Sequence, residues 1–446
     1  MVRYCAIFTF GFFCLVSVVG LEARAASALA DPPSIHLRGG KTIRAGLCGA
    51  NRVTTAVGEG ERLVAVVRRA KRSAPLLRVD RCAGRRWTDG RRIRARRRGA
   101  SFVARIDTSD PADLRVKLRG RRPAYVRVGV GELADVSVRF RVENLNRSMV
   151  PCQSDGKRYT LSGHIVGPRA AMHDGAATTV YLHGAAVPEA TWRMPVPGYD
   201  YGREQARRGH LSVTLDRLSY GSSPTPNGLQ TCFGSQADMA HQIVGQLRAG
   251  TYEADAPIRF SRIALAGHSA GQVIAQIAAY SFGDIDALVV GGWGDPVAKA
   301  EDFVVLVPTV ATCATGGEPK RPGQPAGYAF TFKGVVREFL FYNAEERVIQ
   351  AYVSRHERDA CDASLATAPP INALALSRVQ VPVFLFYGLN DALWPPPTGE
   401  RQRSLFRGSH DVTLLQLPDT GHMIMLGRTA PTFRSAVSAW LADHGF

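Results

Sequence analysis

Hydrophobic and polar positions follow one pattern in the first third of this chain and another in the remainder. In residues 114–119, 125–130 and 138–142, apolar residues alternate with mostly basic ones. An alternation of period two is typical of half-buried antiparallel strands. We therefore predict that residues 31–150 form a small β-sandwich-like domain whose outer face is lined with arginine.

From residue 151 onward, short buried runs alternate with helical segments. Strands are predicted at 159–166, 178–182, 211–218, 263–266, 287–290, 381–387 and 413–417. Helices are predicted at 204–208, 239–247 and 432–441. This order predicts an α/β domain over residues 151–446, with an open, mostly parallel sheet and helices on both of its faces.

The alternation of strands and helices breaks between residues 296 and 375. Residues 316–327 read as a loop, whereas residues 343–346 predict a capped helix start. The apolar residues that follow share one face of this helix: Val348, Ile349, Tyr352 and Val353. An insertion at this point of the chain lies over the carboxyl ends of the strands, so we interpret residues 296–375 as a lid.

The N-terminus has the features of a secretory signal. Arg3 precedes an apolar run over residues 4–20, and Ala23-Arg24-Ala25 is a small-x-small cleavage site, so we assign residues 1–25 to the signal. The apolar run is short for a membrane span, although an uncleaved anchor remains an alternative. No later stretch is long and apolar enough to cross a bilayer, so we expect a soluble, exported protein.

Eight cysteines are present, and Cys5 and Cys14 lie in the signal. Export places the other six in an oxidising compartment, where an even number favours disulfides. No two of them have the spacing of metal ligands, so we expect no metal. We predict pairing in chain order, with free buried thiols as the alternative: Cys48 with Cys82, Cys152 with Cys232, and Cys313 with Cys361.

The net charge of +18 belongs to one part of the chain. Residues 31–150 contain 29 Lys+Arg and 11 Asp+Glu, whereas residues 151–446 contain 25 and 26. We expected the arginines of residues 91–98 to form a loose basic segment. One interpretation of this charge is attraction to an anionic surface; the other is a solvated outer face in an arginine-rich sequence. We expect no nucleic acid, because the strands show no interleaved exposed aromatics.

A candidate nucleophile lies in residues 263–279. A short apolar run leads into Gly267-His268-Ser269-Ala270-Gly271, and an Ala/Ile/Val-rich helical segment follows. The order strand, Gly-x-Ser-x-Gly and helix is that of a nucleophile elbow, where the two glycines permit a sharp turn. The alternative is an ordinary turn with a surface serine.

Further motifs follow other predicted strands: His183-Gly184, residues 216–222, residues 387–391 and Asp419-Thr420-Gly421-His422. Together with the elbow, they make residues 155–446 resemble an α/β-hydrolase of the capped serine-hydrolase kind. The order Ser269, Asp391, His422 is the order that this fold gives its catalytic triad. The resemblance implies an acyl-enzyme mechanism without metal or cofactor.

In such a mechanism His422 takes the proton of Ser269, and Asp391 orients the imidazole and stabilises its cationic form. The resemblance places the oxyanion hole at the backbone N–H groups of Ala185 and Ala270. Asp295 remains an alternative source of the carboxylate. We interpret Asp216 as an organiser of its loop and not as a partner of Ser269.

A serine at the elbow disfavours epoxide opening and halide displacement, which use an aspartate there in this family. Three tryptophans follow strands that bear site motifs, and we predict that they line an apolar acyl pocket or else lie in the core: Trp192, Trp293 and Trp394. The leading hypothesis is an exported hydrolase of carboxylic esters, small or lipid-like. The alternatives are an acyltransferase or peptidase with the same triad, or a surface-binding protein on a hydrolase scaffold.

Overall fold

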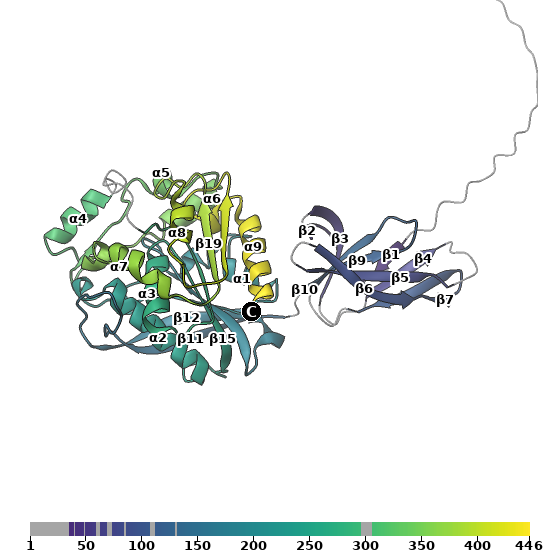
Figure 1. The fold of residues 1–446 in the computed structure, drawn as a ribbon, viewed down its shortest axis with the longest axis horizontal. Helices are drawn as coiled ribbons and strands as arrows, with labels where there is room; N and C mark the ends of the chain where they lie inside the picture. Colours follow the sequence, from purple (N-terminus) through teal and green to yellow (C-terminus); the bar gives the residue numbers. More distant parts are fainter. Residues whose placement is uncertain are drawn as a thin grey trace, which may run out of the picture.

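The computed structural model describes residues 35–39, 41–48, 50–58, 63–68, 74–83, 86–107, 112–129, 132–295 and 306–446 (Figure 1). The predicted signal, residues 1–25, and the first part of the predicted lid, residues 296–305, lie outside the described residues. In the ranges that are described, no helix combines the length and the apolar character that a bilayer crossing requires.

The described N-terminal strands form two sheets. Their bounds are β1 Ile35–Arg38, β2 Lys41–Leu47, β3 Ala50–Gly58, β4 Leu63–Arg68, β5 Leu76–Ala83, β6 Arg86–Arg94, β7 Arg96–Arg98, β8 Ser101–Ile106, β9 Ala112–Lys117 and β10 Ala124–Gly129. One sheet has the order β1-β4-β8-β7 and the other the order β2-β3-β10-β9-β5-β6. Neighbouring strands are antiparallel except β3 and β10, which pair in parallel.

Both sheets contribute alternate residues to one hydrophobic cluster. Leu63 and Val67 come from β4 of the smaller sheet, and Leu114 and Val116 come from β9 of the larger one. Because successive side chains of a strand point to opposite faces, the period-two alternation places these residues inside and the arginines outside. The expected small sandwich-like arrangement of sheets is confirmed.

The arginines of residues 91–98 lie on two consecutive strands and not in the loose segment that we expected. β6 belongs to the six-stranded sheet and β7 to the four-stranded sheet, and Ala95 between them is buried. All six arginines of this stretch, here called the arginine corner, are exposed: Arg91, Arg92, Arg94, Arg96, Arg97 and Arg98.

An eight-stranded sheet follows. Its strands are β11 Leu133–Glu143, β12 Arg158–Pro168, β13 Ala176–Leu182, β14 Ser212–Leu215, β15 Phe260–His268, β16 Ala287–Gly291, β19 Val383–Gly388 and β20 Val412–Leu417. The strand order is β11-β12-β14-β13-β15-β16-β19-β20, in which β12 is antiparallel to both neighbours and the other pairs are parallel. The predicted mostly parallel sheet is confirmed.

The predicted boundary at residue 150 is wrong, because β11 is the first strand of the eight-stranded sheet. Its residues pair with β12 along their whole length, from Leu133 opposite Pro168 to Glu143 opposite Arg158. The alternating segment 138–142 was correctly predicted as a strand but assigned to the wrong sheet. Period-two alternation reports that one face is buried and does not report which partner buries it.

Helices cover both faces of this sheet (Figure 1). They are α1 Tyr201–Ala206, α2 Phe233–Ala249, α3 Ala270–Phe282, α8 Thr398–Arg403 and α9 Ala430–Asp443. Helix α2 packs on α3, and α1 packs on α9. Helix α2 begins six residues before the predicted start, because the buried polar residues Gln236 and Asp238 interrupt its apolar period and bind Arg217 and Arg147.

The insertion between β16 and β19 contains α4 Val307–Ala314, β17 Tyr328–Ala329, α5 Val336–Leu340, α6 Glu346–Val353, β18 Asp359–Ala360 and α7 Ala368–Ala375. Helix α6 starts where the sequence predicted, although no side chain caps its first N–H groups. Val348, Ile349 and Tyr352 are buried as expected, whereas Val353 is 44% exposed. Short 3-10 turns complete the described fold: Arg169–Ala171, Glu189–Thr191, Gly228–Gln230, Ala363–Leu365, Leu376–Arg378 and Ile424–Leu426.

Three disulfides connect the cysteines in chain order, as predicted. They join Cys48 to Cys82 in the N-terminal sheets, Cys152 to Cys232 at the start of α2, and Cys313 to Cys361 within the insertion. Disulfides of this number are typical of proteins that fold in an oxidising, extracytoplasmic compartment.

Candidate active site

Ser269 lies at a sharp turn between β15 and α3. Its backbone has φ 54° and ψ −124°, a conformation that costs a non-glycine residue roughly 1–3 kcal/mol. A Cβ on Gly267 would lie 2.1 Å from the carbonyl oxygen of Gly271, and a Cβ on Gly271 would lie 2.3 Å from that of Leu182. The two glycines therefore permit the close approach of backbone that this turn requires.

His422 is held by Asp391 through its Nδ1. The Nδ1 atom lies 2.9 Å from Oδ2 of Asp391, and both side chains are buried. The other carboxylate oxygen of Asp391 accepts the N–H groups of Leu393 and Trp394. Because the carboxylate accepts from Nδ1, the proton of a neutral His422 lies on Nδ1, and Nε2 remains able to accept one.

Asp295, the alternative carboxylate, lies in a separate buried network. Its oxygens accept from side-chain amides and an indole and do not bind His422. Burial raises the pKa of Asp295 to about 6, because its partners are neutral donors and not cations. The donors are Gln276, Trp293, Asn372 and Gln402.

His268, the residue before Ser269, supports the His422 loop. Its Nε2–H donates to the backbone carbonyl of His422 at 2.9 Å. Burial lowers the pKa of His268 well below its ordinary value, so the ring stays neutral. These contacts give His268 a structural role beside the site.

Ser269 and His422 border one small cavity. Its other walls come from the loop after β13, from the insertion and from the residues next to Ser269 and His422: Gly184, Ala185, Thr191, His268, Phe332, Leu340, Tyr352 and Met423. The cavity volume is about 10 Å³, roughly what one water molecule needs. The two side chains form no hydrogen bond with each other, although both are among the described residues.

The peptide that follows Gly184 belongs to a residue that borders this cavity, Ala185. Buried Arg217 donates to the carbonyls of His183 at 3.0 Å and Gly184 at 2.9 Å. In a trans peptide the N–H points away from the C=O, so the Ala185 N–H points away from Arg217. Ala270 is the first residue of α3, where the N–H groups of a helix have no internal acceptor.

The three tryptophans are buried and are not among the residues that border this cavity, which favours the core over the acyl pocket of the two predicted alternatives. Trp192 is buried against Tyr181 and Tyr201, whereas Trp293 and Trp394 pack against each other with ring centroids 4.8 Å apart. Large aromatic rings bury much apolar area, and here they supply the core beneath the site. The apolar walls are instead Phe332, Leu340, Tyr352 and Met423.

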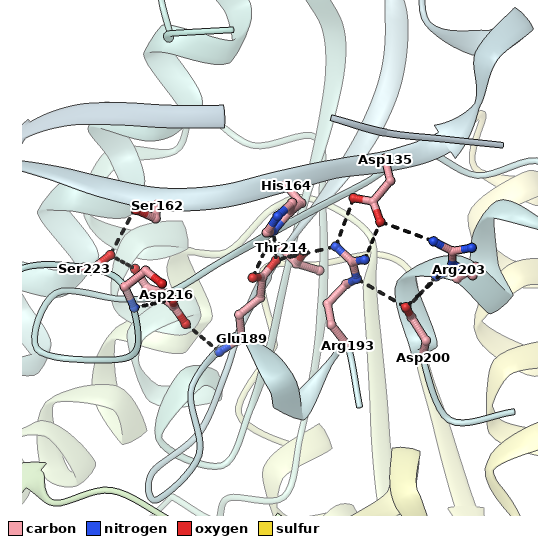
Figure 2. Close-up of polar contacts among 11 residues, drawn as sticks. Asp135, Ser162, His164, Glu189, Arg193, Asp200, Arg203, Thr214, Asp216 and Ser223 are labelled. Carbon is pink, nitrogen blue, oxygen red and sulfur yellow. Dashed lines mark hydrogen bonds and ion pairs between the residues drawn. The ribbon is translucent and has the colours of Figure 1, made fainter. Parts of the chain in front are cut away.

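A polar network holds the far end of the loop after β13 (Figure 2). Asp216 accepts the N–H of Glu189 at 2.9 Å and that of Ser222 at 2.8 Å, in agreement with its expected role in the loop. The Glu189 carboxylate lies 2.8 Å from His164 Nδ1 and raises the pKa of this histidine. Burial raises the pKa of Asp216 to about 6.

Arg217 is the residue of this region that the sequence analysis missed. It lies inside the motif 216–222, of which only Asp216 was assigned a role. Its guanidinium is nearly buried and lies 4.6 Å from the centroid of the Tyr220 ring. The signal that could have found it is an arginine directly after a buried strand end, where a cation needs acceptors such as free carbonyls.

Most of the α/β part of the chain matches a known protein family. Residues 179–434 match the sequence model described as the alpha/beta hydrolase family. This chain belongs to the α/β-hydrolase family. The match includes the elbow, the loop after β13 and both other candidate catalytic residues. No curated protein matches the chain.

Among solved structures, an esterase from Thermogutta terrifontis aligns at 17% identity with a TM-score of 0.47. The alignment covers 69% of this chain and 99% of the esterase. A monoacylglycerol lipase from Paleococcus ferrophilus aligns at 17% identity with the same TM-score, covering 64% of this chain and 99% of the lipase.

Proposed function

We propose that this α/β-hydrolase cleaves a carboxylic ester through an acyl-serine intermediate. Ser269 Oγ attacks the ester carbonyl while His422 Nε2 takes its proton. The same proton then passes to the departing alcohol, and water releases the acyl group by the reverse sequence. Asp391 holds the imidazole of His422 in the tautomer that these proton transfers need. The N–H groups of Ala185 and Ala270 stabilise the oxyanion.

One observation supports the proposal above the others. Ser269, His422 and the peptide of Ala185 border the same cavity, and Asp391 binds the Nδ1 of His422. Acyl transfer requires a nucleophile, a base with its orienting carboxylate and a backbone donor around one space. Thr191, which also borders the cavity, donates its hydroxyl to the carbonyl of Val187 at 3.0 Å.

The experiment is covalent labelling by an alkyl fluorophosphonate combined with ester turnover. Wild-type protein should be labelled once, at Ser269, and should hydrolyse p-nitrophenyl esters. Ser269→Ala should abolish labelling, and Ser269→Ala and His422→Ala should each lower kcat by several orders of magnitude. Full turnover by purified Ser269→Ala protein would remove the serine-hydrolase proposal and favour the binding-protein alternative.

Acyl transfer and peptide hydrolysis use the same groups and differ in the acceptor or leaving group. They are distinguished by product analysis. We propose hydrolysis as the reaction, so the acid should form at the same rate when an alcohol acceptor is added. Transfer would give a new ester instead, and peptide hydrolysis would give turnover of an amide substrate.

We propose that the insertion acts as a lid. Phe332, Leu340 and Tyr352 of the insertion wall a cavity of about 10 Å³, which is far smaller than any ester substrate. Substrate entry therefore requires displacement of the insertion. The Cys313–Cys361 disulfide lies within the insertion and limits how far its two ends can separate.

We also propose that the protein is exported and associates with an anionic lipid surface through the arginine corner. The three disulfides support an oxidising compartment. The corner places six exposed guanidinium groups within eight residues, and no described carboxylate pairs with them. Such a cluster of charge attracts anionic surfaces and loses its attraction in salt.

A further inference from the structure

Ala186, the residue after the candidate oxyanion donor Ala185, is bound on both of its backbone groups by the insertion. Its N–H donates to Oδ1 of Asp359 at 2.8 Å, and its carbonyl accepts the N–H of Glu357 at 2.7 Å. Ala186 is fully buried and has φ +73°. A left-handed conformation costs an alanine roughly 1–2 kcal/mol, so its neighbours must hold it there.

Asp359 also binds Tyr220, whose ring contacts the residue before Gly184 in the loop after β13. Its Oδ1 accepts the hydroxyl of Tyr220 at 2.6 Å. The Tyr220 ring packs edge-on against His183, with centroids 4.7 Å apart. One carboxylate oxygen therefore connects the residues before and after the Gly184-Ala185 peptide.

The position of Asp359 is itself fixed. Strand β18, which contains it, pairs with β17 of the insertion, and the Cys313–Cys361 disulfide follows two residues later. Asp359 is 7% exposed, and its Oδ2 accepts no hydrogen bond from a described residue. A buried carboxylate with one unsatisfied oxygen lowers the stability of the fold. We therefore ask what the other oxygen, which accepts the N–H of Ala186, contributes to the site.

We infer that Asp359 is a positioning residue for the oxyanion hole. Arg217 holds the loop at the carbonyl of Gly184, and Asp359 holds it at the N–H of Ala186. The Ala185 N–H lies in the chain between these two anchors, and Ala185 borders the cavity together with Ser269. The inference rests on the proposed function, since an oxyanion forms only if Ser269 attacks a carbonyl.

Two substitutions of Asp359 distinguish the effect of its accepting oxygen from the effect of its negative charge. Asp359→Asn keeps Oδ1 and places an amide where Oδ2 has no partner, so it should retain kcat within about threefold. Asp359→Ala removes the acceptor of the Ala186 N–H. Loss of one oxyanion donor costs about 10²–10³ in kcat, and misplacing one should cost about 10–100-fold. KM should stay within about twofold, because the donor acts on the transition state.

The experiment measures kcat and KM of wild type, Asp359→Asn, Asp359→Ala and Asp359→Glu on one p-nitrophenyl ester, with Ser269→Ala alongside. Affinity for a trifluoromethyl ketone, which forms an oxyanion on Ser269, should fall in Asp359→Ala by the same factor as kcat/KM. A residue with a merely structural role would lower the fraction of labelled protein without changing kcat per labelled site.

Asp359→Glu covers the case in which Asp359→Ala does not fold. It keeps the charge and shifts the accepting oxygens by one methylene, and it should lower kcat by about tenfold. Wild-type kcat per active site in both Asp359→Ala and Asp359→Glu would overturn the inference alone. A wild-type protein without turnover and without labelling would overturn the proposed function, and the inference with it.

Discussion

The Nδ1 atom of His422 lies 2.9 Å from Oδ2 of Asp391, and this contact separates two carboxylates that the sequence left as alternatives. Asp391 follows β19, and His422 follows β20, the neighbouring parallel strand. The carboxyl ends of parallel neighbours meet at the same edge of a sheet, so the loops that follow them come together. Asp295 follows β16, the strand on the other side of β19, and its carboxylate binds four neutral donors instead.

Asp391→Asn should lower kcat by about 10³–10⁴, because an amide at this position favours the wrong tautomer of His422. Asp295→Asn should lower kcat by less than about tenfold when rates are normalised to fluorophosphonate-titrated sites. Steady-state kinetics of both variants on one p-nitrophenyl ester is the measurement. The reverse ranking would assign the orienting role to Asp295.

The contribution of three buried aspartates to the stability of the protein should fall as pH rises from about 4 to 6. Burial raises the pKa of Asp216, Asp295 and Asp362 to about 6, whereas an unfolded aspartate titrates near 3.8. Between these values the folded chain holds protons on the three aspartates that the unfolded chain has lost, so their contribution to the free energy of unfolding decreases with pH. Buried His210 and His268, whose pKa values are lowered, contribute in the opposite direction, so each group is tested by its own substitution.

Asp295→Asn removes one of these groups. Its stability relative to wild type should therefore rise by roughly 3 kcal/mol between pH 4 and pH 7. Thermal unfolding at four pH values across this interval measures the difference. Asp174→Asn is the control: the pKa of this exposed carboxylate is lowered by Arg259, so its titration lies below the interval. A constant difference for Asp295→Asn would show that Asp295 is already ionised at pH 4.

Phe332→Ala should widen the range of esters that the enzyme accepts. The ring borders the cavity at Ser269, and its removal leaves room for several methylenes of an acyl chain. We expect kcat/KM for an octanoyl ester, relative to an acetyl ester, to increase by about tenfold. Val336→Ala is the matched control, because Val336 is a buried residue of the insertion that does not border the cavity. An equal increase in the control would indicate general loosening of the insertion.

Changing Arg92, Arg94, Arg96 and Arg98 to Glu should abolish association with vesicles that contain phosphatidylglycerol. Wild-type association should weaken steeply between 50 and 300 mM salt, because exposed charges are screened within roughly 10 Å at 0.1 M. Turnover of a small soluble ester should not change. Binding is measured by vesicle co-sedimentation.

The control for this experiment reverses four arginines of the α/β part that are at least 64% exposed and that pair with carboxylates: Arg141, Arg158, Arg169 and Arg259. The change in net charge is then the same in both proteins. Equal loss in both would indicate a general charge effect without a specific corner. Binding to an acidic polymer but not to vesicles would reassign the partner.

The Trp87 and Tyr125 rings lie side by side on the N-terminal sheet, with centroids 6.0 Å apart, and this relationship was not visible in the sequence. Arg115 lies over Trp87 and Arg52 over Tyr125. No single strand shows interleaved aromatics in the sequence, because these four residues come from four different strands. Buried Asp80 binds Arg78, Arg115 and Lys117, so these cations are not freely available charge. The arginine corner is for this reason the better site to test.

Local patterns were enough to predict the elements and motifs. The run before Ser269, the two glycines around it and the continuous, mostly apolar runs of β13, β16 and β19 are properties of neighbouring residues, so the sequence shows them directly. The order of Ser269, Asp391 and His422 follows from chain connectivity in the same way. The even number of cysteines after the signal favoured disulfides, whereas their pairing in chain order was one of 15 connectivities until the structure placed the sulfurs together.

Only the tertiary structure decided which partners those elements meet. It placed β11 in the eight-stranded sheet, moved the three tryptophans into the core and brought Asp359 to Ala186, 173 residues earlier in the chain. Alternation shows that a face is buried but not what buries it, and a hydrogen bond over such a separation leaves no periodic trace in the sequence. These contacts arise because the insertion and the loop after β13 pack at the same edge of the sheet.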